Sequence, residues 1–200
     1  MERQQLHDLI SSVCHAIIAH TDELTTLDQA IGDGDHGLNM KRGCEAIQAE
    51  IETISDKPLP DALQAIGTKL VMTIGGASGP LYGTLFLSLA KSCPQVPDRA
   101  NLVAAFKSAI DAVAARGKSQ TGQKTMLDVL YPAFEAFLAG KSLKEVAIQC
   151  DSSANATAPM LAIRGRASFL GERSIGHIDP GARSSALLIS TITHVLGAAN

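Results

Sequence analysis

The sequence has 200 residues, a formal net charge of −3 at pH 7 and 46% apolar residues. This length and apolar content suit one domain with a sizeable core, so we expect a single domain over residues 1–200. A mildly acidic chain without a basic block is not expected to bind nucleic acid. The sequence has no apolar run of membrane-spanning length and no signal peptide at its start. We therefore expect a cytoplasmic protein with no membrane partner.

Apolar residues recur at helical spacing almost throughout, and no segment alternates as a half-buried strand would. The spacing predicts about eight helices. Their approximate ranges are 2–20, 40–54, 59–74, 81–90, 103–113, 127–137, a segment beginning at 142, and 180–196. Short connections favour antiparallel neighbours, so the fold class is all-α.

Local signals fix some of the helix ends. Ser142 with Glu145 makes a capping box, and Asp179 followed by Pro180 reads as the N-cap and first residue of the last helix. Pro132 should kink the sixth helix and Pro159 should bend or split the seventh.

The cysteines are few, scattered and without a CxxC pair. They are Cys14, Cys44, Cys93 and Cys150. In a chain of this size such cysteines are expected to be buried free thiols rather than disulfides or zinc ligands.

Four polar, glycine-containing loops interrupt the helices, at 28–39, 75–80, 117–126 and 171–181. If successive helices alternate in direction, every second connection lies at the same end of the bundle. The four loops occupy such alternate connections, so they should meet at one end. The helix N-termini that follow them would attract phosphate there.

The first loop holds Asp28, Asp33 and Asp35 together with His36 among glycines. Its Gly-x-Gly-x-x-Gly spacing matches a dinucleotide fingerprint, but the preceding strand that this motif needs is missing. A calcium loop fails because Gly37 and Cys44 stand where oxygen ligands belong. A magnesium site remains, because Mg²⁺ favours one or two carboxylates plus substrate phosphates. The alternative is a solvated turn whose aspartates cap the next helix.

The other loops offer groups that suit phosphate. The run from Gly75 to Gly79 exposes backbone amides and a serine hydroxyl, and the segment 164–174 carries three arginines. The Gly117–Gly122 spacing resembles a P-loop, but Gln123 stands where the lysine belongs, so we reject that motif. Lys118 and Lys124 either neutralise phosphate or are solvated surface lysines, and His36 either contacts a phosphate or orients an aspartate.

Several segments together resemble the nucleotide-binding subunit of dihydroxyacetone kinases. They are LDQAIGDGDHGLNM (27–40), GGASGPLYGT (75–84), RGK (116–118), GQKTMLD (122–128) and GRASFLGERSIGHIDPGA (165–182). The match extends in order over nearly the whole chain. The resemblance implies a closed antiparallel barrel of eight helices with the nucleotide site at one end.

The resemblance also implies roles for particular residues. Asp28, Asp33 and Asp35 would coordinate two Mg²⁺ ions and, with Arg166, carry the catalysis. The nucleotide, ADP or ATP, would be lined by a larger set. This set is His36, Gly37, Leu38, Asn39, Ala77, Ser78, Gly117, Met126, Arg166, Asp179, Pro180 and Gly181.

By resemblance, dihydroxyacetone is held by a separate partner subunit, which receives the γ-phosphoryl group. A free-standing chain resembles the branch in which ADP stays bound and is rephosphorylated by a phosphocarrier protein of the sugar phosphotransferase system. Two alternatives stay open: an ATP-using kinase subunit for a related ketose such as erythrulose, and a nucleotide-bound regulatory or docking module. A homodimer is a further expectation.

Overall fold

The computed structural model describes residues 1–198, which form ten α-helices and one 3₁₀ helix and contain no strand. The elements are α1 (Arg3–Ala19), α2 (Thr21–Ile31), α3 (His36–Gln48), α4 (Ile51–Ser55), α5 (Leu59–Thr73), α6 (Ser78–Ser92), α7 (Arg99–Gly117), α8 (Leu127–Leu138), α9 (Leu143–Ala156), η1 (Arg166–Ser174) and α10 (Pro180–Ala198). The predicted all-α class is confirmed.

Eight of the helices pack side by side in a closed ring. Their order around it is α1, α3, α5, α6, α7, α8, α9 and α10, and α10 packs against α1 to complete the circuit. The remaining helices lie outside this ring: α2 packs on α3, α10 and η1, and α4 packs on α1 and α5. The eight expected helices correspond to the ring, while the three extra helices lie within its connections.

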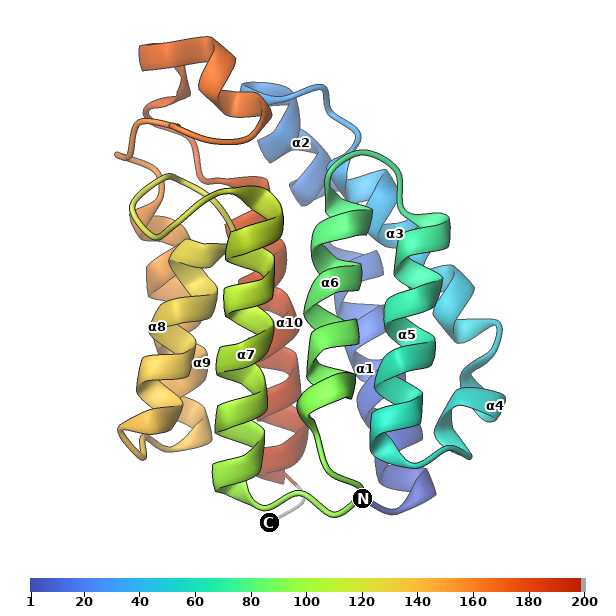
Figure 1. Ribbon diagram of the computed structural model, residues 1–200. Coiled ribbons are helices and arrows are strands. Elements are labelled where there is room, and N and C mark those ends of the chain that lie inside the picture. Colours follow the sequence, from blue (N-terminus) through green and yellow to red (C-terminus); the bar gives the residue numbers. More distant parts are fainter. Residues whose placement is uncertain (199–200) are drawn as a thin grey trace.

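Neighbouring helices of the ring run in opposite directions (Figure 1). The start of α1 and the end of α10 therefore lie at one end of the barrel, and η1 and the connection through α2 lie at the other. The close approach of α5 and α6 depends on small residues. A Cβ atom on Gly83 would collide with the side chain of Val71 and lie 3.2 Å from the carbonyl oxygen of Gly67.

The helix-capping signals read from the sequence are found in the structure. Ser142 and Glu145 form the reciprocal capping box of α9. Asp179 caps α10, because its Oδ2 accepts a hydrogen bond of 2.7 Å from the amide of Ala182. The α8 helix runs through Pro132. The prediction that Pro159 bends or splits the seventh helix was wrong, because α9 already ends at Ala156.

The predicted boundary of the first loop was wrong. Residues 21–31 form α2 instead of a loop from 28, and Asp28 lies in the last turn of that helix. The residues that face inward, Thr21, Leu24, Asp28 and Ile31, have the spacing of one helical face. The helix was missed because a carboxylate occupies one of these inward positions.

A continuous core fills the barrel, and it includes Cys14, Cys44 and Cys150. Leu24, Ile110, Leu127 and Leu130 are fully buried in this core. All four cysteines are free and buried, as predicted. Among residues 1–198, no helix combines the length and apolarity needed to cross a membrane.

Two leucines of α8 provide a matched test of the core. Leu130 is 0% exposed and Leu138 is 66% exposed. Leu130→Ala should lower the free energy of unfolding by about 2–5 kcal/mol, because it leaves a cavity in the ring. Leu138→Ala should change it by no more than about 0.5 kcal/mol. Urea denaturation measures both, and equal losses would contradict the core assignment.

Candidate nucleotide and metal site

A cavity of about 450 Å³ opens at the end of the barrel where the four connections meet. This volume lies in the range of small-molecule sites. Twelve of the predicted site residues line it: Asp28, Asp33, Asp35, His36, Ala77, Ser78, Gly117, Met126, Arg166, Asp179, Pro180 and Gly181. The structure thus brings together residues from all four connections, as the alternation of helix direction predicted.

Three predicted site residues do not line the cavity. Gly37 is buried where α3 meets α2, and a Cβ atom there would collide with the carbonyl oxygen of Thr21. The Leu38 side chain is exposed, and Asn39 is buried and accepts a 3.3 Å hydrogen bond from Arg42. Gly37 therefore has an evident packing role in the fold.

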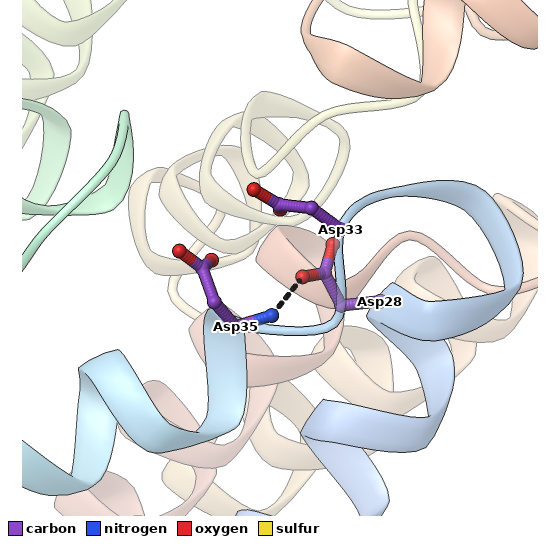
Figure 2. A group of neighbouring side chains, drawn as sticks. All are labelled: Asp28, Asp33 and Asp35. Carbon is purple, nitrogen blue, oxygen red and sulfur yellow. Dashed lines mark hydrogen bonds between the residues drawn. The ribbon is translucent and has the colours of Figure 1, made fainter.

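The three aspartates lie together at the mouth of this cavity. Oxygen atoms from Asp28, Asp33 and Asp35 all lie within 4.8 Å of one another. Figure 2 shows the three side chains around one small space, with Asp33 above and with Asp28 and Asp35 on either side. Asp33 and Asp35 are exposed, whereas Asp28 is buried. Hard carboxylate oxygens in this arrangement fit a divalent cation such as Mg²⁺.

The backbone fixes Asp28 relative to the other two carboxylates. Its Oδ2 accepts hydrogen bonds from the amides of Asp35 (2.9 Å) and His36 (3.1 Å), which open α3. The first of these bonds is the dashed line in Figure 2. Because Asp28 also caps α3, its replacement would disturb the fold as well as any bound metal.

Arg166 reaches the same cluster from η1. Its Nη1 lies 2.9 Å from Oδ2 of Asp33, and both side chains are exposed. This ion pair joins the connection after α9 to the one after α2. A guanidinium at this position is suited to neutralise a phosphate that lies beside the carboxylates.

The imidazole of His36 lies between two serine hydroxyls. Nδ1 is 2.9 Å from Ser78 Oγ, and Nε2 is 2.8 Å from Ser184 Oγ. Burial lowers the pKa of His36, against the opposing effect of Asp28 and Asp35. Ser184 Oγ also lies 2.7 Å from the hydroxyl of Tyr82, whose pKa burial raises to about 12. A neutral network therefore ties α3, α6 and α10 together beneath the cavity.

Three of the four helix N-termini at this end have a side-chain acceptor. Asp28 accepts from amides at the start of α3, Asp179 caps α10, and Thr125 Oγ1 accepts from the amide of Leu127, the first residue of α8. The fourth, that of α6, has no side-chain cap among the described residues. Its free amides and the Ser78 hydroxyl make it the N-terminus best suited to an anionic ligand.

Comparisons with known proteins agree with this geometry. The DAK2 domain model matches residues 30–194. The chain is 43% identical over 166 residues to "PEP-dependent dihydroxyacetone kinase 1, ADP-binding subunit DhaL" of Listeria innocua, which covers 82% of each chain. It is 36% identical over 202 residues to "PEP-dependent dihydroxyacetone kinase, ADP-binding subunit DhaL" of Escherichia coli, which covers 96% of each. The chain belongs to this family of kinase subunits.

Membership in the dihydroxyacetone kinase family makes the chain a phosphotransferase subunit. The fold is also that of the dihydroxyacetone kinase of C. freundii, with a TM-score of 0.79 at 22% identity over 94% of this chain and 34% of that one. The same kinase has been solved in complex with AMP-PNP and Mg²⁺, with a TM-score of 0.78.

Two residues of this kinase subunit were missed or misread in the sequence. Asp128 was not singled out, although it holds the loop before α8. Lys124 was expected either to neutralise phosphate or to be solvated, but it is only 1% exposed and its ammonium contacts backbone carbonyls. For Asp128, the available signal was its position six residues after the loop glycine Gly122. The setting of Lys124 depends on contacts from a distant segment.

Asp179 gives a pH-dependent prediction. Burial raises its pKa to about 7, and the negative Asp128 adds to this, while the Ala182 amide and Lys124 oppose it. A carboxyl whose pKa is higher in the folded state stabilises the fold fully at acidic pH. That stability is lost as the pH rises through the folded pKa.

We therefore compare the free energy of unfolding of Asp179→Asn with that of the wild type. As the pH rises from about 5 to about 8, this difference should shift in favour of the variant by roughly 1 kcal/mol or more. The asparagine oxygen still accepts from Ala182. Urea denaturation of both nucleotide-free proteins in EDTA measures the difference at each pH. A difference that stays constant, or that changes in favour of the wild type as pH rises, would contradict the assignment.

Proposed function

We propose that this subunit holds Mg²⁺ with ADP or ATP in the cavity and passes the γ-phosphoryl group to dihydroxyacetone bound on a partner subunit. The observation that carries the proposal is the meeting of three carboxylates, Arg166 and the uncapped N-terminus of α6 around one cavity. Phosphoryl transfer depends on positioning and charge neutralisation, which these groups supply. The proposed unit is the single domain of residues 1–200.

Asp28, Asp33 and Asp35 are the proposed ligands of two Mg²⁺ ions. Such ions neutralise the negative charge of the nucleotide phosphates. The complex of the C. freundii kinase with AMP-PNP and Mg²⁺ supports this by analogy. When Asp33 holds a metal, Arg166 is free to leave its ion pair and bind a phosphate oxygen. The three aspartates and Arg166 are therefore the proposed catalytic groups.

We assign the phosphates to the start of α6 and the rest of the nucleotide to the remaining cavity. Ala77 and Ser78 would face the phosphates, because this helix start is uncapped. Gly117, Met126 and the segment 179–181 line the same cavity and would contact the nucleoside. His36 would act through Ser78, whose hydroxyl it holds.

The acceptor would lie on a partner subunit that docks over the cavity mouth. Four exposed apolar side chains support this, because they lie on the segment that carries Arg166. They are Leu161, Ile163, Phe169 and Ile175, and Phe169 is 88% exposed. The names of the relatives, which describe an ADP-binding subunit, agree with a divided enzyme.

The proposed phosphoryl donor to bound ADP is a phosphocarrier protein of the phosphotransferase system, acting in the cytoplasm. The support is that the relatives are described as PEP-dependent or PTS-dependent kinases. A subunit that exchanges free ATP for a ketose such as erythrulose, and a nucleotide-bound regulator, are the alternatives that the tests below separate. The homodimer stays a prediction.

The metal assignment is tested on Asp35, whose carboxylate is exposed. Asp35→Asn should weaken Mg²⁺-dependent binding of ADP by roughly tenfold or more, since the site loses one of three negative ligands. Asp22→Asn removes an exposed carboxylate of α2 outside the cavity and serves as the control. Calorimetric titration with and without Mg²⁺ measures both. Equal ADP affinity in the two variants would contradict the metal site.

The donor assignment predicts that ADP is a resident cofactor. A ligand held by a metal, a helix N-terminus and an arginine should dissociate slowly, because differences in affinity arise mostly from differences in the dissociation rate. The protein should therefore purify with ADP, and EDTA should release it and lower the melting temperature. Ligand at about a thousand times its Kd stabilises the fold by roughly 4 kcal/mol.

The same preparation tests the division of labour. The isolated chain should not phosphorylate dihydroxyacetone with ATP, whereas addition of a dihydroxyacetone-binding subunit and a phosphorylated phosphocarrier should restore turnover. Turnover by the chain alone would overturn the two-subunit proposal. A nucleotide-free protein whose melting ignores EDTA and ADP would favour the ATP-exchanging alternative.

A further inference from the structure

Lys124 lies in an environment unusual for a lysine. Its side chain is buried, and its Nζ lies within hydrogen-bond distance of five backbone carbonyl oxygens. These belong to Thr157 (3.0 Å), Ala158 (3.3 Å), Met160 (3.1 Å), Ser174 (2.7 Å) and His177 (2.6 Å). An ammonium has three hydrogens, so the five carbonyls share them. The lysine thus acts as a cation inside a cage of carbonyl dipoles.

The cage joins the two ends of one long loop. Three of its carbonyls come from residues 157–160, directly after α9, and two come from residues 174–177, before α10. We call these two stretches the neck and the segment between them, residues 161–173, the lid. The lid contains most of η1 and extends beyond the end of the barrel (Figure 1).

Other hydrogen bonds close the neck around the lysine. The amide of Gly176 donates to the Ala158 carbonyl at 2.8 Å, and the amide of Asp179 donates to Thr157 Oγ1 at 2.9 Å. Each neutral bond of this kind contributes little alone, whereas bonds from a charged donor are roughly twice as strong. Lys124 is the charged donor at the neck, and it donates to both of the stretches that form the neck.

The lid reaches the candidate site through its arginines. Arg164 and Arg166 both line the cavity, and Arg166 pairs with Asp33. The lid is held at two places. Ala162, Ala167 and Leu170 pack against Ile31 at the end of α2, and the neck fixes the base of the lid. The neck therefore contributes to where Arg166 lies relative to the aspartates.

The backbone at Lys124 is itself in an uncommon conformation. Its φ is 60°, in the left-handed region that non-glycine residues rarely adopt. Asp128 holds the loop in this shape by accepting from the amides of Gly122 and Thr125. A lysine kept in an unfavourable conformation and buried among carbonyls indicates a requirement for the cation at this place.

We propose that Lys124 is a positioning residue, an internal cation that fastens the neck of the lid and so holds Arg166 over the nucleotide cavity. This inference deepens the proposed function and rests on it. All five carbonyl partners of the cation lie in the neck, and its link to the ring is the electrostatic interaction with Asp179, the cap of α10. Loss of the charge should loosen the lid locally and shorten the residence of a bound nucleotide.

Lys124→Met tests the charge, since methionine keeps a comparable apolar stem but offers the carbonyls no donor. Hydrogen exchange should become faster at lid and neck amides and stay unchanged in the ring. Release of a fluorescent ADP analogue should be roughly tenfold to a hundredfold faster, the loss expected for charged hydrogen bonds. Lys118→Met is the matched control, because Lys118 lies in the same connection with a φ of 48° but is exposed and does not line the cavity.

A second variant separates charge from packing. Lys124→Ala leaves a space of the shape of n-propylammonium, so millimolar propylammonium should slow lid exchange and nucleotide release again. Uncharged 1-propanol fills the same space and should not. Rescue by a cation is a result that a lysine serving only as packing would not give.

The outcomes test the role of Lys124 separately from the proposed nucleotide-binding function. Unchanged lid exchange in Lys124→Met, faster exchange throughout the ring, or equal rescue by propanol would each overturn the role of Lys124. Failure of the wild-type protein to bind the ADP analogue would instead overturn the proposed function, while the exchange measurements would still test the neck.

Discussion

Because each helix of a closed antiparallel ring runs opposite to its neighbours, every second connection reaches the same end of the barrel. This constraint brings together the segments before α3, α6, α8 and α10, which lie far apart in the sequence but line one cavity. The apolar ring supplies rigidity, and the connections at one end supply the polar chemistry. Proteins often separate their scaffold from their site in this way.

The same end concentrates positive helix termini, and side-chain oxygens balance most of them. Asp28 and Asp179 accept from backbone amides at the start of α3 and α10, and Thr125 Oγ1 accepts from the Leu127 amide at the start of α8. The α6 terminus is left without a side-chain cap among the described residues. The distribution of caps thus selects one helix start for an anion, which a count of helix N-termini alone does not do.

Much of this arrangement could be predicted from the sequence because its causes are local. Helical spacing revealed the ring helices, and the capping box at Ser142 and the N-cap at Asp179 each depend on residues three positions apart. The family resemblance rested on contiguous motifs and identified the family, and most of the residues that it assigned line the cavity.

The residues that the sequence did not predict correctly depend on contacts with other segments of the chain. Asp28 looked like a loop residue because a buried carboxylate interrupts the apolar face of α2, and its burial depends on amides at the start of the next helix. Lys124 could not be assigned, because its five carbonyl partners follow it by 33 to 53 positions. The setting of His36 depends on Ser184, which is 148 positions away. Such contacts exist only once the ring has closed.

The central claim is that the three aspartates bind metal beside a nucleotide at the start of α6. A crystal structure of the complex with ADP and Mn²⁺, recorded with anomalous scattering, tests it most directly. The account predicts anomalous peaks between Asp28, Asp33 and Asp35, with the ADP phosphates bridging toward Ser78 and with Arg166 released from Asp33. Nucleotide bound without metal at these carboxylates, or with its phosphates at another helix terminus, would contradict it.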